Sequence, residues 1–182
     1  MPILSAAEMS DGSGLSGCVV GLQRSGGGVP KLPVERAAIR FGGMEGDWQR
    51  NRKHHGGPDR ALCLYSQELI DALVTEGHPM ARGAIGENVT VTGVRWARMQ
   101  PGALLQIGTV AVEVTAYAWP CQTIQSAFLN GGTTRISEKL FPGWSRVYAR
   151  VIAEGEVWVG APVAFTGPIR LVPESDIGAS QT

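Results

Sequence analysis

A short basic stretch, residues 53–60, has the residue types of an anion-binding loop. Its sequence is Lys53-His54-His55-Gly56-Gly57-Pro58-Asp59-Arg60. The two adjacent glycines permit backbone N–H groups to converge on a ligand, and Arg60 offers a planar fork of donors that suits phosphate or carboxylate. The alternative is an ordinary solvated loop. Zinc is a weaker interpretation, because the two adjacent histidines have no third ligand at a typical spacing.

The second candidate is a cysteine, and the three cysteines of the chain differ in their settings. Cys63 lies inside an apolar run and Cys18 beside Val19 and Val20, so both are expected to be small buried hydrophobic residues with inert thiols. Cys121 follows Trp119-Pro120 at the end of a long predicted strand, where the chain exposes its side chains. A thiolate at this position would act as a nucleophile or as a ligand for a soft metal.

Two further polar residues are weaker candidates. Asn88, in Gly86-Glu87-Asn88, could hydrogen-bond a ligand or only close the turn before a strand. Lys31 follows Pro30 in a glycine-rich loop and could contact a phosphate or be an exposed surface lysine.

The elements that must position these residues are mostly short strands. Apolar runs and alternating patterns predict strands over 18–23, 37–41, 61–65, 87–92, 104–107, 110–116, 147–154, 157–159 and 163–165. Ser66 is a good N-cap for one helix that Gly77 would end, with an apolar face made of Leu69, Ile70, Leu73 and Val74. Short helical turns are expected over 122–128 and 135–140.

This pattern predicts a mainly β fold, a closed barrel or a sandwich with a few short helices. The 182 residues include 25 glycines and 11 prolines, as expected for many turns, and no helices separate the strands as a doubly wound fold requires. We expect one domain over 17–166, with a lead-in over 1–16 and a tail over 167–182.

Composition narrows the class of partner and the compartment. The 16 basic and 16 acidic residues cancel, which argues against a protein that binds mainly nucleic acid or an anionic membrane. The N-terminal sequence lacks a signal-peptide pattern, and the unpaired cysteines fit a reducing environment. We therefore expect a cytoplasmic protein.

Several short motifs, taken in order, resemble one known family. They are Gly28-Val29-Pro30-Lys31-Leu32-Pro33-Val34, Gly46-Asp47, His54 to Ala61, Gly86 to Thr90, Ile107-Gly108, Pro120-Cys121 and Gly143 to Arg150. The chain is similar, from about Gly17 to Phe165, to MOSC-domain proteins, named after the C-terminal domain of molybdenum-cofactor sulfurase, and in particular to the stand-alone bacterial type.

The resemblance implies a closed β-barrel and a molybdopterin-type molybdenum cofactor. Cys121 would be the catalytic cysteine and the metal ligand, or would carry sulfur. The residues expected to contact the pterin or its phosphate are Lys31, His55, Gly56, Gly57, Asp59, Arg60 and Asn88. Four of them, Lys31, His55, Arg60 and Asn88, lie near predicted strand ends and are expected to converge with Cys121 where the loops of the barrel meet.

Three functions follow from these residues. The first is an oxidoreductase that reduces N-hydroxylated substrates, with electrons from a separate reductase because the chain has no flavin, haem or iron–sulfur motif. The second is a non-catalytic cofactor carrier or sulfur-transfer module. The third, a cysteine hydrolase using Cys121 and His55, lacks an oxyanion-hole motif. The protein is expected to be a monomer or homodimer.

Overall fold

The computed structural model describes residues 16–48 and 57–167. These residues form β1 (Ser16–Arg24), β2 (Leu32–Val34), β3 (Arg36–Arg40), β4 (Gly43–Met44), β5 (Leu62–Ser66), β6 (Val89–Thr92), β7 (Leu104–Ile107), β8 (Val110–Tyr117), β9 (Val147–Ala153), β10 (Gly155–Trp158) and β11 (Pro162–Phe165). The α-helix of the described part is α2 (Gln67–Thr75), and short 3₁₀ turns are η1 (Pro58–Arg60), η2 (Trp96–Arg98), η3 (Gln122–Ala127), η4 (Leu129–Gly131) and η5 (Thr133–Ile136).

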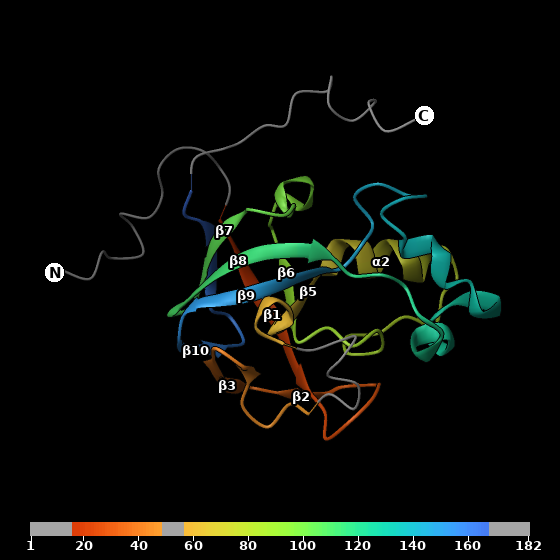
Figure 1. Cartoon of the computed structure of the whole chain (residues 1–182). Helices are drawn as coiled ribbons and strands as arrows, with labels where there is room; N and C mark the ends of the chain where they lie inside the picture. Colours follow the sequence, from red (N-terminus) through yellow and green to blue (C-terminus); the bar gives the residue numbers. More distant parts are fainter. Residues whose placement is uncertain (1–15, 49–56, 168–182) are drawn as a thin grey trace, which may run out of the picture.

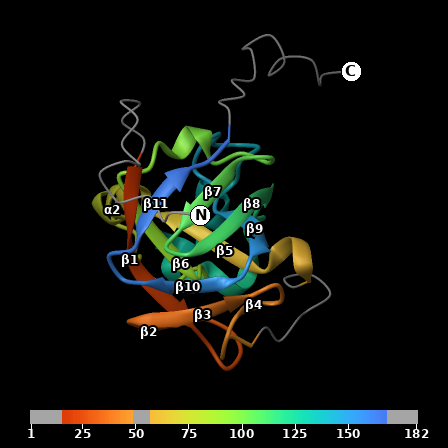
Figure 2. The ribbon, with the colours of Figure 1, turned by 90° about the vertical axis from the view of Figure 1, so that its left-hand side faces the viewer.

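The strands close into a barrel, which confirms the predicted fold class. Seven strands follow the order β11-β7-β8-β9-β5-β6-β1, and β1 pairs back onto β11, while β2 extends the sheet beyond β1. The β5–β6 pair is parallel, and the other barrel pairs are antiparallel. A smaller sheet, β10-β3-β4, lies across the lower end of the barrel (Figures 1 and 2).

The apolar pattern of each strand explains its place in the barrel. Val110, Val112 and Val114 of β8 are fully buried and alternate with partly exposed residues, so one face of this strand lines the barrel interior. β5 is buried at all five positions. Its alternate side chains face two cores, because Leu62 and Leu64 pack in the barrel while Tyr65 packs under α2.

The helix begins as predicted, and its buried face is narrower than predicted. The Ser66 Oγ accepts a hydrogen bond from the Leu69 N–H, and Gly77, with φ +93°, follows the C-terminal end. Ile70 and Leu73 are buried, but Val74 is 49% exposed, so its assignment to the buried face was wrong. The helix packs through a stripe too narrow to include this position.

Two other local predictions need correction. Cys18 is only half-buried, because Val19 occupies the inward-facing position of β1 and its neighbours face outward. The second short helical turn covers Thr133–Ile136 rather than 135–140. The first, over 122–128, is present as η3. The lead-in and most of the tail lie outside the described residues.

Candidate functional site

The β8 arrow ends beside α2 (Figure 1). The segment that follows it carries Cys121, which packs against the core under α2. The Ala118 N–H donates to the Arg146 carbonyl (2.8 Å), and Arg146 Nη2 donates to the Trp119 carbonyl (3.1 Å). Pro120 has no N–H to continue the ladder, so the chain leaves the sheet in front of Cys121. Two hydrogen bonds with Arg146, one accepted by its carbonyl and one donated by its side chain, therefore fix the strand end that carries the cysteine.

Cys121 presents a partly accessible thiol. The residue is half-buried and has an extended backbone, with φ −133° and ψ 164°. Its Sγ lies 2.7 Å from the Thr123 hydroxyl, and its apolar side packs against the core under α2. The sulfur is held in one place while part of it stays open to a ligand.

Arg60 comes from another segment, η1, which packs against β9. η1 follows Gly57, whose φ of +100° suits a glycine, and it places the Arg60 guanidinium 5.4 Å from the centre of the Tyr148 ring. Burial raises the pKa of Tyr148 to about 12, and the charges of Cys63, Arg146, Arg60 and Cys121 act on the same hydroxyl. Arg60 therefore packs over the ring of Tyr148, two residues after Arg146 along the chain.

Lys31 and Asn88 meet in a buried polar cluster centred on Asp47. Lys31 Nζ lies 2.6 Å from Asp47 Oδ2, and the two side chains are 8% and 4% exposed. Asn88 Nδ2 donates to the same oxygen (2.9 Å), and the Ser25 N–H donates to Oδ1 (2.8 Å). Lys31 is therefore neither an exposed lysine nor a free cation, but half of an internal ion pair.

Cys63 adjoins this cluster. Its backbone N–H donates to Asn88 Oδ1 (3.2 Å), and it lies opposite Tyr148 in the β5–β9 register. Burial raises the pKa of its thiol, as predicted, while the nearby Arg146 opposes the shift. The apolar run around Cys63 therefore predicted its burial, while the nearby Arg146 comes from a distant part of the chain.

The remaining predicted site residues are scattered or lie outside the described ranges. Asp59 is directed along the outside of the barrel, where Arg150 Nη1 lies 3.3 Å from its carboxylate. Gly57 is exposed. His55 and Gly56 lie outside the described residues.

Sequence analysis missed three residues of this region: Asp47, Glu87 and Arg146. Glu87 is fully buried, and burial raises the pKa of its carboxyl. Its Oε2 and the Arg146 Nε are buried without a hydrogen-bond partner in the described part of the chain. All three lay in quoted motifs, but no pattern in the sequence distinguished Arg146 from a surface arginine.

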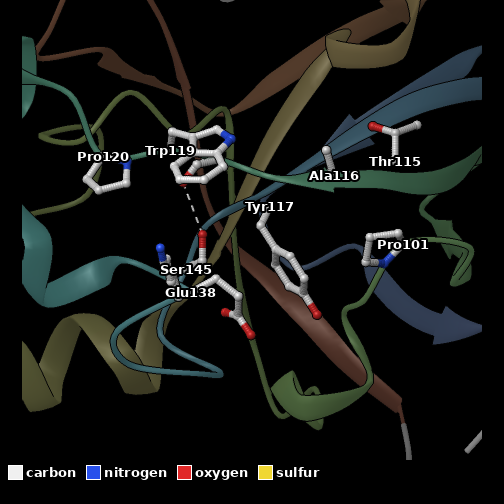
Figure 3. Close-up of a pocket in the computed structure, with 10 residues that line it drawn as sticks. Pro101, Thr115, Ala116, Tyr117, Trp119, Pro120, Glu138 and Ser145 are labelled. Atoms are coloured by element: carbon white, nitrogen blue, oxygen red, sulfur yellow. Dashed lines mark hydrogen bonds between the residues drawn. The ribbon is translucent and has the colours of Figure 1, made fainter. Parts of the chain in front are cut away.

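A pocket of about 390 Å³ adjoins the Cys121 segment (Figure 3). Tyr117, Trp119 and Pro120 line one side, and Pro101, Glu138 and Ser145 line the rest with Thr115, Ala116, Ala118 and Lys139. The Ser145 hydroxyl donates to the Ala118 carbonyl (3.0 Å), which fixes the pocket floor to the same segment. The segment that follows β8 therefore lines the pocket and also carries Cys121.

The fold and the site define a closed β-barrel protein that presents a partly accessible cysteine after one barrel strand, close to the buried guanidinium of Arg146. The sequence model of the MOSC domain matches residues 51–164. The chain belongs to the MOSC-domain family, which is associated in general with binding of the molybdenum cofactor.

Known relatives agree with this assignment. The chain is 30% identical over 138 residues to the uncharacterized protein YflK of Bacillus subtilis, covering 74% of this chain and 61% of the relative. It is 30% identical over 142 residues to the protein YiiM of Escherichia coli, covering 75% and 62%. The crystal structure of that YiiM superposes with a TM-score of 0.64 at 23% identity, covering 85% of this chain and 71% of the other. The chain thus spans about three-fifths of the length of these curated relatives.

One further observation concerns membranes. Within the described ranges, no helix has the length and apolar character needed to cross a bilayer.

Proposed function

We propose that the chain binds a molybdopterin-type molybdenum cofactor at this end of the barrel, with Cys121 as the protein ligand to the metal. The observation that carries the proposal is the partly accessible Cys121 thiol, at a strand end that the buried Arg146 guanidinium holds through the Trp119 carbonyl. The Arg60 guanidinium lies over the ring of Tyr148, two residues after Arg146. A thiolate is a soft ligand suited to molybdenum, and guanidinium groups suit the anionic parts of a phosphorylated pterin.

The residues present fit such a group. Cys121 has one polar neighbour, the Thr123 hydroxyl, so its sulfur can accept a further bond. The buried Arg146 guanidinium donates to the Ile85 and Trp119 carbonyls, and its Nε has no hydrogen-bond partner among the described residues, so a positive charge with an unused donor lies close to the strand end. Buried positive charge stabilises an anion bound beside it.

The other expected contacts are assigned by position. Arg60 and Gly57 would hold the phosphate from the η1 side, with His55 and Gly56 preceding them in the same loop. Lys31 and Asn88 would support the site from the interior and would not contact the cofactor directly, because both already bind the Asp47 carboxylate. A direct contact from Asp59 stays a prediction, since its carboxylate faces Arg150.

We further propose that the protein reduces N-hydroxylated substrates. The reaction converts R–NHOH, two electrons and two protons into R–NH₂ and water, so it needs an electron donor. A separate reductase would supply the electrons, since nothing in the sequence resembles a flavin, haem or iron–sulfur site. The cofactor, when bound, would supply the two-electron removal of oxygen, while Cys121 and the arginines would hold and orient it.

The experiment is cofactor analysis followed by turnover. Protein made in a host that synthesises the cofactor should contain molybdenum and a fluorescent pterin, and with a supplied electron donor it should reduce benzamidoxime. Molybdenum and pterin without turnover would overturn the oxidoreductase proposal and leave a carrier or sulfur-transfer module. Protein without either would contradict cofactor binding.

A further inference from the structure

The pocket beside the Cys121 segment has flat apolar walls. Trp119 is 73% exposed, and its indole has no hydrogen-bond partner within the described part of the chain. The Tyr117 ring extends into the same space, and Pro101 and Pro120 add two rigid surfaces (Figure 3). An exposed tryptophan beside a tyrosine and two prolines is a good surface for stacking a planar ring.

The polar side of the pocket carries a partly buried acid. Both Glu138 carboxylate oxygens lie near one donor, the Gly143 N–H, at 3.1 and 3.0 Å, which leaves further acceptor capacity on each oxygen. Burial, and then the charge of Glu138, raise the pKa of Tyr117, so its hydroxyl stays neutral and can donate at physiological pH.

The neighbouring Lys139 does not cancel this acid. Lys139 also lines the pocket but is exposed, so water and salt screen its charge more strongly than that of the less exposed Glu138. Glu138 is less exposed and is fixed by its bond to Gly143. A ligand in the pocket therefore meets a fixed negative charge and a more strongly screened positive one.

We propose that this pocket binds a small planar aromatic cation, with the ring against Trp119 and Tyr117 and its N–H groups on the Glu138 carboxylate. Aromatic faces attract cations, and a fork of two N–H donors pairs with a carboxylate through charge-assisted hydrogen bonds. The volume, about 390 Å³, is at the small end of ligand pockets and suits one ring with a short substituent.

That the bound molecule is a substrate of the reaction rests on the proposed function. Pro120 lines the pocket and directly precedes Cys121, so the substrate ring would lie beside the residue that holds the metal. Under this assignment, Glu138 sets the preference for substrates whose N-hydroxylated group is attached to a positively charged ring system. Binding of the cation itself does not depend on any metal.

The test is calorimetric titration of the full chain without cofactor, using phenylguanidine and its neutral isostere phenylurea. We expect phenylguanidine to bind at least about tenfold more tightly than phenylurea, as one charge-assisted pair implies. Glu138→Gln should remove this preference, whereas Lys139→Gln should retain it. Trp119→Ala should weaken both ligands, and Trp48→Ala, a control at another exposed tryptophan, should weaken neither.

Equal affinity for the two ligands, or an unchanged preference in Glu138→Gln, would overturn the proposal. If Glu138→Gln disturbs the loop, the comparison of Trp119→Ala with Trp48→Ala decides, and equal effects of the two would also overturn it. Failure here is separable from failure of the proposed function. A chain that holds molybdenum but ignores phenylguanidine refutes only the pocket, and the converse result refutes only the cofactor.

Discussion

The buried ion pair between Lys31 and Asp47 gives a sharp test of the polar cluster. Asp47 Oδ2 accepts hydrogen bonds from Lys31 Nζ (2.6 Å) and Asn88 Nδ2 (2.9 Å), and Oδ1 accepts one from the Ser25 N–H (2.8 Å). In Asp47→Asn, either orientation of the amide places its NH₂ against at least one of these donors. The Lys31 ammonium, 8% exposed, also loses its counter-charge.

The two single variants should differ in cost. Breaking a buried pair from the acidic side leaves an uncompensated buried ammonium, so Asp47→Asn should lower the free energy of unfolding by about 3–5 kcal/mol. In Lys31→Met the carboxylate keeps two donors, Ser25 and Asn88, so the loss should be about 2 kcal/mol. The double variant should cost less than the sum, by about 1–3 kcal/mol.

Urea unfolding at neutral pH, followed by circular dichroism, measures these values. A matched control is Glu156→Gln, which removes an exposed pair with Arg36 (3.8 Å; side chains 55% and 66% exposed) and should cost less than about 0.5 kcal/mol. The reasoning would be refuted if Asp47→Asn cost no more than this control, or if the Lys31 and Asp47 effects were simply additive.

Three further outcomes follow from the structure. All three tyrosines of the chain have raised pKa values, that of Tyr148 reaching about 12 through burial, so spectrophotometric titration should show little phenolate at pH 10 in the folded protein. Because the unfolded chain releases these protons first, near its ordinary pKa of about 10, stability should fall as pH rises from about 10 to 12, and normal titration would contradict this. Gly43→Ala should cost about 2 kcal/mol in urea unfolding, because φ is +119° and the new Cβ would lie 2.6 Å from the Ala61 carbonyl oxygen, whereas Gly42→Ala, in open space, should be neutral; equal effects would refute the strain. Cys63→Ala should lower stability by about 1–2 kcal/mol, and Cys63, 5% exposed, should resist labelling in the native protein; fast labelling there would show that its burial is misassigned.

Much of the fold could be predicted because its strands carry strong local patterns. The alternation of Val110, Val112 and Val114 marks a strand with one buried face, and the continuous apolar run of β5 marks a strand buried on both faces. Both could be predicted because apolar residues occupy the buried positions of a strand. The N-cap at Ser66 was equally predictable, because the capping hydrogen bond is local.

The polar environment of the site could not be predicted in the same way, because it depends on contacts between distant segments. Lys31 is paired by Asp47, sixteen positions away, across two loops. Cys63 meets Arg146 only because β5 and β9 are neighbours in the sheet. The sequence left Lys31 as either a phosphate contact or an exposed lysine, and the structure instead pairs it with Asp47 in the interior. The burial of Cys63 was predicted, but its proximity to Arg146 could not be.

The central claim is that Cys121, and neither of the other cysteines, holds the molybdenum. The most direct measurement is the molybdenum content of Cys121→Ser and Cys18→Ser proteins purified from a host that makes the cofactor. Cys18 is the matched control, because it is also half-buried and a serine there should be tolerated. We predict that Cys18→Ser retains the wild-type molybdenum content while Cys121→Ser, folded with an unchanged melting temperature, contains none. A Cys121→Ser protein that retained the wild-type amount of molybdenum would contradict the account.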